Sequence, residues 1–170
     1  MKIRKPNNDE DLTAWRAFFE ACRRHHESLR GRLPEHALEL LNLQGVDDGL
    51  LVEAVYERKT RTLQLTLRCG HLLMGYYDLT LVFREASLSP HSRTTLRRIA
   101  ETTKGDGIWE YELYRFELDT TPSGGIILRL EFLGFYDDPW FEVRCKELQW
   151  HTKPVADPKL PVIPRRYREV

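Results

Sequence analysis

Two stretches of the chain decide the fold: LTLVFREASL at Leu79–Leu88 and FEVRCKELQW at Phe141–Trp150. In each stretch apolar and polar residues alternate, as they do in a strand with one buried face. A basic residue and a glutamate then interrupt the alternation, at Arg84-Glu85 and Lys146-Glu147, and it resumes out of phase. One extra residue turns every later side chain to the opposite face of a sheet, so we predict a β-bulge at each pair.

The two stretches are similar enough to indicate an internal duplication. Just upstream, the sequence GYYD at 75–78 parallels GFYD at 134–137, although the spacing is not identical. Chance similarity between aromatic-rich strands is the alternative explanation. We favour two copies of one strand-rich unit, at 50–88 and 108–150, because the alternation fails at the same place in both.

Strand-like alternation also marks the residues around these stretches. From Leu50 onward apolar residues recur at every second position, and the connections are too short for parallel crossovers. We therefore predict an antiparallel meander of three strands in each unit. The expected strands lie at 50–56, 63–69 and 79–83, and then at 109–118, 126–132 and 141–145.

Helical spacing is found before the first unit and between the two units. Behind the acidic run 9–11, apolar residues recur at intervals of three and four up to about Arg30, and Pro34 can begin a shorter second helix. A mid-chain helix is expected at 90–104, with Ser89 or Ser92 as its N-cap.

The sequence thus predicts an α+β fold. N-terminal helices at 9–43 pack on a largely antiparallel sheet of about six strands, and the mid-chain helix joins the two units. One domain is expected over 1–150. Four prolines then punctuate 151–170, so we expect an extended tail without a packed element.

Composition excludes several classes of protein. With 41% hydrophobic residues the chain is not mainly disordered, and 26 basic residues balance 26 acidic ones, unlike a dedicated DNA or anionic-membrane binder. No apolar stretch reaches the roughly 18 residues of a membrane helix, and no secretory signal is evident. Three scattered cysteines, Cys22, Cys69 and Cys145, predict reduced thiols and a cytoplasmic protein.

No established catalytic motif occurs in the sequence. His36 and Glu39 would lie one helical turn apart, a geometry that can supply two metal ligands, and Cys69-Gly70-His71 brings a thiol near an imidazole. A solvated helix face and a buried cysteine before a turn are the simpler explanations. In the first helix His26 falls on the apolar stripe and His25 is expected to face solvent. We favour a non-enzymatic protein with no catalytic residue, no metal and no cofactor.

Aromatic and acidic residues gather at predicted loops and strand ends. A large ring at such a place either folds back into the core or anchors an interface, and with neighbouring aspartates it would suit a basic protein partner. We predict a binding surface made of Tyr76, Tyr77, Asp78, Phe135, Tyr136, Asp137, Asp138 and Trp140.

The alternating segments Leu63–Leu67, Tyr77–Phe83 and Phe141–Trp150 resemble a loose group of uncharacterised bacterial strand-rich proteins, domains of unknown function. Some members of that group occur near polymorphic toxins and are regarded as immunity proteins. The resemblance covers roughly half the chain and implies a bacterial protein of similar fold. It transfers no functional residue.

These observations lead to one main functional hypothesis and two others. The main one is a non-enzymatic protein-binding module, in its narrowest form an immunity-type inhibitor that occludes a bacterial toxin. The alternative is a small-molecule-binding or hydrolytic domain with a cleft between the two units, whose mouth is lined by Tyr77, Asp78, Tyr136 and Asp137. Single-stranded nucleic-acid binding is favoured only by strand aromatics and the basic run 165–168, without a basic groove.

Overall fold

The computed structural model describes residues 11–47, 49–71, 73, 75–101, 113–132, 140–155 and 166–170. Within these residues the helices are α1 (Leu12–Leu29), α2 (Glu35–Glu39), a short 3-10 helix (Leu40–Asn42) and α3 (Pro90–Glu101). The strands are β1 (Leu50–Glu57), β2 (Thr62–His71), β3 (Gly75–Arg84), β4 (Ser87–Leu88), β5 (Leu113–Thr120), β6 (Ile126–Phe132), β7 (Trp140–Cys145), β8 (Glu147–Val155) and β9 (Arg166–Glu169).

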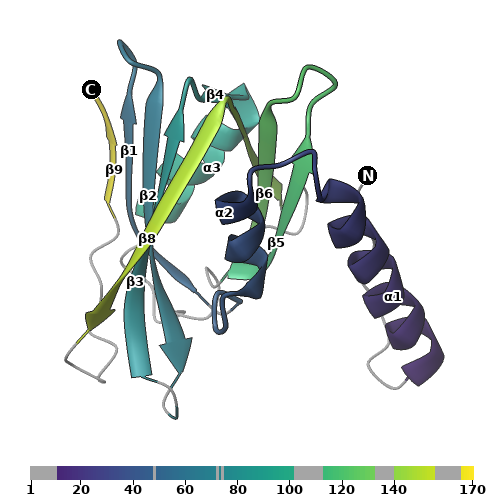
Figure 1. Cartoon of the computed structure of the whole chain (residues 1–170). Helices are drawn as coiled ribbons and strands as arrows, with labels where there is room; N and C mark the ends of the chain where they lie inside the picture. The colour runs from purple at the N-terminus through teal and green to yellow at the C-terminus, as the bar shows by residue number, and fades with distance from the viewer. Residues whose placement is uncertain are drawn as a thin grey trace.

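The strands form two sheets (Figure 1), one of five strands in the order β8-β3-β2-β1-β9 and one of four in the order β4-β7-β6-β5. Every pairing between the described strands is antiparallel except that of β1 with β9. The predicted α+β class is confirmed. The prediction of one sheet of about six strands is wrong, because the strands divide between two sheets that share one core.

The topology of the first sheet is repeated in the second. Each contains a three-stranded meander, β1-β2-β3 or β5-β6-β7, and each meander continues into a strand that joins the other sheet, β4 or β8. A register shift occurs at Leu51/Glu53 in β1 and at Leu113/Arg115 in β5. These two shifts are separated by the same chain distance as Phe83 and Cys145, so the two halves are matched in detail.

The predicted flip of the side chains occurs at both basic–acidic pairs, but its cause is not a β-bulge within one ladder. At each pair the chain leaves one sheet and enters the other. Glu85 has a φ of 53°, and the Lys146 amide donates to the Arg84 carbonyl at 3.1 Å, so the two crossings lie against each other. The pairing of β3 with β8 and that of β4 with β7 keep one register through the crossing.

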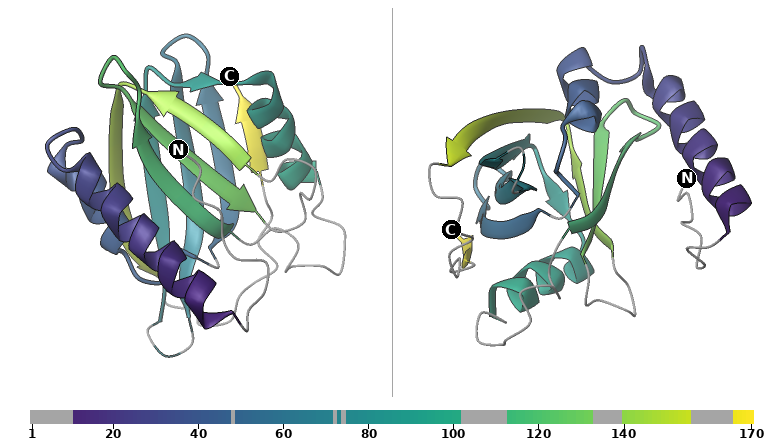
Figure 2. Two further views of the ribbon diagram at one scale, coloured as in Figure 1. Left: turned by 90° about the vertical axis from the view of Figure 1, so that its right-hand side faces the viewer. Right: turned by 90° about the horizontal axis from the view of Figure 1, so that it is seen from below.

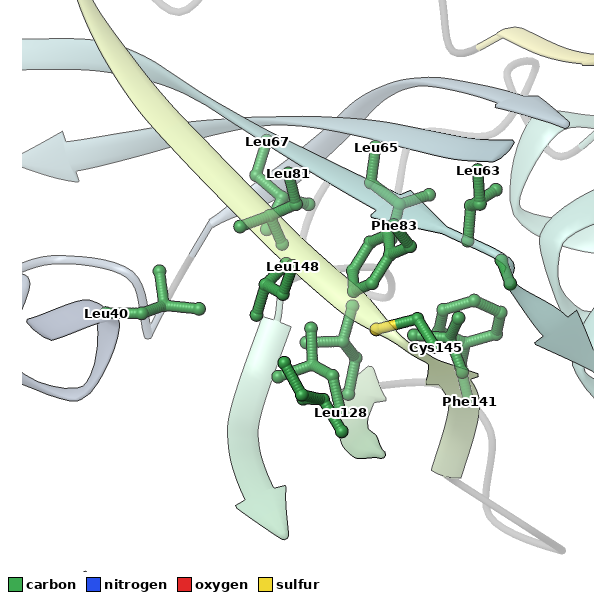
Figure 3. Packing of buried hydrophobic residues seen from close by; sticks show 14 of the residues in the cluster. Leu40, Leu63, Leu65, Leu67, Leu81, Phe83, Leu128, Phe141, Cys145 and Leu148 are labelled. Carbon is green, nitrogen blue, oxygen red and sulfur yellow. The ribbon is translucent and has the colours of Figure 1, made fainter. Parts of the chain in front are cut away.

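A single hydrophobic core lies between the sheets. Figure 3 shows Leu65 and Phe83 from the five-stranded sheet close to Leu128, Phe141 and Cys145 from the four-stranded sheet, all of them buried. Buried residues from both units therefore fill the space between the sheets.

The helices cover the edges and the outer side of this double layer. In Figure 2 the four-stranded sheet stands between α1 and the five-stranded sheet. Asp11 is the N-cap of α1, its carboxylate accepting from the Ala14 amide at 2.9 Å, and Ser89 rather than Ser92 caps α3. Ser92 instead donates its hydroxyl to the Glu142 carbonyl of β7 at 2.9 Å.

The last part of the chain differs from the predicted extended tail. Residues 151–155 continue β8, and β9 joins the five-stranded sheet beside β1. The part of the expected strand at 109–112 lies outside the described residues. None of the helices in the described segments combines the length and the apolar character needed to span a membrane.

Candidate protein-binding surface

The structure uses two of the predicted binding residues inside the fold. The Tyr77 hydroxyl donates to the Gln44 carbonyl at 2.6 Å, and burial raises the pKa of Tyr77 to about 12. Asp78 forms an ion pair with Arg68 of the neighbouring strand at 2.5 Å, and only 12% of the Arg68 side chain is exposed. Tyr77 therefore bonds to the loop that contains Gln44, and Asp78 is paired with Arg68, so both have partners within the fold.

Of the remaining predicted residues, two lie at the beginnings of strands in different sheets. Tyr76 is half-buried at the beginning of β3, opposite Val155 of β8. Trp140 begins β7 opposite Glu131. The predicted residues Phe135, Tyr136, Asp137 and Asp138 lie outside the described segments.

A different aromatic surface is present on α1. Leu12, Trp15 and Phe19 follow one another at spacings of three and four, and Phe18 lies beside them. The three rings contact one another with centroids 5.5 to 5.7 Å apart. Leu12 is 70% exposed and Phe19 61% exposed. We call Leu12, Trp15, Phe18 and Phe19 the α1 aromatic surface.

The sheet beneath α1 carries paired charges on the side that faces the helix. Arg115 donates to Glu117 within β5, and Arg129 of β6 contacts Glu142 at 2.9 Å and Asp119 at 3.3 Å. Glu117 and Arg129 are 5% and 9% exposed. Because these charges are buried, their ion pairs offset the cost of removing them from water. Of the residues in α1 only Leu29 is buried.

Neighbouring arginines form hydrogen bonds with the Glu142 carboxylate of this charged layer. Burial alone would raise the pKa of Glu142, but hydrogen bonds from Arg144 and Arg129 lower it below its ordinary value. The Arg115 guanidinium lies 5.0 Å from the centre of the Phe18 ring, a cation–π distance. Phe18 therefore connects the helix to the charged layer, whereas Phe19 points away from it.

Two histidines attach the helices to the edges of the sheets. His25, predicted to face solvent, is half-buried, and its Nε2 lies 2.8 Å from the Leu118 carbonyl of the edge strand β5. His36 of α2 makes the same contact with the Leu148 carbonyl of β8 at 2.6 Å, and the Trp150 indole donates to the His36 carbonyl. Both imidazoles donate to carbonyls that a further strand would otherwise bind.

The other residues singled out for chemistry have structural roles. Burial raises the pKa of the Cys69 thiol to about 12, and that of Cys145 likewise to about 12. Gly70 has a φ of 101°, and a Cβ placed there would lie 2.2 Å from the Gly75 carbonyl oxygen. The Cys69-Gly70-His71 segment is thus a close approach of two strands that requires glycine.

The spacing of the α1 aromatic surface is visible in the sequence. It identifies an apolar stripe, but not that the sheet facing this helix is charged. That information lies in Glu117 and Arg129, whose positions relative to α1 depend on the tertiary structure.

Comparison of the chain with protein families, curated proteins and solved structures finds no match.

Proposed function

We propose that this protein is a non-enzymatic protein-binding module that uses the α1 aromatic surface. The observation that carries the proposal is the exposure of Leu12 and Phe19, 70% and 61%, on a helix whose other side lies on a charged sheet. Large apolar side chains grouped on one exposed helix face are typical of interaction sites.

The spacing of the anchors indicates how a partner would bind. Leu12, Trp15 and Phe19 occupy positions i, i+3 and i+7, the pattern by which an amphipathic helix enters an apolar groove. In Figure 1 α1 diverges from the four-stranded sheet toward its beginning, where Leu12 lies. We therefore expect the partner to supply a groove lined with apolar side chains that receives this end of α1.

An immunity-type inhibitor of a bacterial toxin is the narrower form of the proposal. Its support is the resemblance of the strand segments to proteins of that kind. The alternative, a ligand-binding or hydrolytic cleft between the two units, is less well supported, because buried side chains such as Phe83 and Phe141 fill the interior and Tyr77 and Asp78 have internal partners.

The test compares substitutions of two exposed apolar residues. Phe19→Glu changes the α1 aromatic surface, and Leu73→Glu changes a residue that is 93% exposed on the β2–β3 turn. Both variants and the wild-type chain are used as affinity baits in cells of the native host, and the captured partner is then titrated by calorimetry.

We expect the partner to bind wild type and Leu73→Glu equally, and Phe19→Glu at least roughly 30-fold more weakly, the effect of a central interface anchor. Circular dichroism should show that all three proteins are folded. Equal affinity of the partner for Phe19→Glu and wild type, or the absence of a stoichiometric partner, would contradict the proposal.

A further inference from the structure

A second binding site is suggested by the way β9 is held. β9 runs parallel to β1, from Glu53 opposite Arg166 to Tyr56 opposite Glu169. The Val170 amide donates to the Tyr56 carbonyl at 3.0 Å, and the Arg58 amide donates to the Val170 carbonyl at 2.8 Å. This is the only parallel pairing among the described strands, and it resembles the addition of a peptide strand to a sheet edge.

Arginines surround the acidic side chain of β9. The Glu169 carboxylate accepts from Arg58 at 2.7 Å and from Arg97 of α3 at 3.0 Å, and only 9% of its side chain is exposed. Arg93 of α3 lies close enough to lower the pKa of Glu169 further, and its Nε is buried without a hydrogen-bond partner among the described residues. Two arginines thus bind the carboxylate, and the guanidinium of the third lies 5.6 Å from the Tyr56 ring.

The other contacts of β9 fix its register. Tyr167 lies opposite Ala54, on the same face of the strand as Glu169, and packs partly buried against the core. Arg168, on the opposite face, forms an ion pair with Glu53 at 2.7 Å. β9 therefore presents an aromatic residue and, two positions later, a carboxylate on one face against this edge.

β9 contributes to the core only at its margin, through the partly buried Tyr167. None of its residues belongs to the buried set that fills the interior, and the remaining four strands of the sheet are joined by antiparallel ladders. The chain reaches β9 only after residues 156–165, which include three prolines. β9 therefore has the contacts of a tethered peptide ligand more than those of a core strand.

We infer that the edge of β1, together with the arginines of α3, is a binding site for an extended peptide that carries an aromatic residue and, two positions later, an acidic one. In the isolated chain β9 occupies this site. Because β9 belongs to the same chain as the site, it competes with a free peptide as an intramolecular ligand, so a free peptide binds only when β9 is released. The site lies apart from the α1 aromatic surface and does not depend on it (Figure 1).

The experiment uses the full chain and a fluorescein-labelled peptide with the sequence of residues 165–170. Glu169→Lys places a positive charge between Arg58 and Arg97 and should release β9. The matched control is Glu27→Lys, which also removes a glutamate paired with an arginine, but on the exposed face of α1. Faster trypsin cleavage within 165–168 of the variant reports the release of β9.

We expect the labelled peptide to bind Glu169→Lys at least tenfold more tightly than wild type or Glu27→Lys in an anisotropy titration. A peptide with lysine at the glutamate position should not bind, and adding Arg97→Glu to the Glu169→Lys chain should abolish binding of the original peptide. If Glu169→Lys does not fold, Tyr167→Ala releases β9 in its place. A folded variant with a cleavable tail that binds the peptide no better than wild type overturns the inference.

Discussion

At the scale of the residue, one carboxylate joins three parts of the molecule. Glu169 of β9 accepts hydrogen bonds from Arg58 in the β1–β2 turn and from Arg97 in α3. The hydrogen bond from Arg58 is the largest cause that lowers the pKa of Glu169 below its ordinary 4.5. A carboxylate with a lowered pKa stabilises the folded state at pH values above its unfolded pKa, and this contribution is lost as pH falls through the folded pKa.

We expect Glu169→Gln to be less stable than wild type at pH 7, because it loses charge-assisted hydrogen bonds. The difference in the free energy of unfolding between the two proteins should shrink as pH falls below about 4.5. Urea unfolding at pH 7, 5 and 3.5 measures this difference. A gap that stays constant with pH would show that the ionised carboxylate does not hold β9.

At the scale of the element, the edge strands are protected by helices and charge. α1 covers β5 through His25, and α2 covers β8 through His36 and Trp150. An uncovered edge presents unpaired carbonyls and amides that can pair with another chain. The two histidines therefore cover strand edges. No local sequence pattern reveals this role, since each histidine lies on a helix and binds a distant strand.

His25→Ala removes the donor to the Leu118 carbonyl, and we expect it to cost about 1 kcal/mol of unfolding free energy, the usual net value of one such hydrogen bond. His151→Ala is the control, because His151 is exposed on β8. Urea unfolding followed by circular dichroism gives both values. If the two substitutions have the same effect, the His25 contact does not contribute to stability.

At the scale of the whole molecule, the two halves depend on each other. Each sheet is completed by a strand of the other half, β4 in the four-stranded sheet and β8 in the five-stranded sheet. Phe83 from one half and Phe141 and Leu148 from the other are fully buried in the same core. Separating the halves would expose this core to water at a large cost in free energy.

We therefore expect that neither fragment folds alone when the chain is divided between residues 104 and 105. The mixed fragments should reassociate and unfold cooperatively, because each supplies the missing strand of the other. Circular dichroism of the separate and mixed fragments, followed through thermal unfolding, checks this. A cooperative transition in either isolated fragment would show that its half is an independent domain.

Elements that depend on local alternation could be predicted from the sequence. The bounds of α1 follow from the acidic N-cap Asp11 and the spacing of its apolar residues, and β1 begins at Leu50, where the period changes. The side-chain flips after Phe83 and Cys145 were also predictable, because the alternation of apolar and polar residues is a local property of the sequence. The partners of the predicted binding residues could not be predicted in this way, since Tyr77 and Asp78 are bound by Gln44 and Arg68 from other segments.

The sequence by itself determined the α+β class, the position of the helices and the matched side-chain flips of the two strand units. Only the tertiary structure decided which sheet each kinked strand joins, that α1 lies on a charged layer with Phe19 in water, and that β9 returns to the edge of β1. The physical reason is that period and capping act over a few residues. Pairing and burial instead join segments far apart in the chain, and they are chosen by the free energy of the whole core.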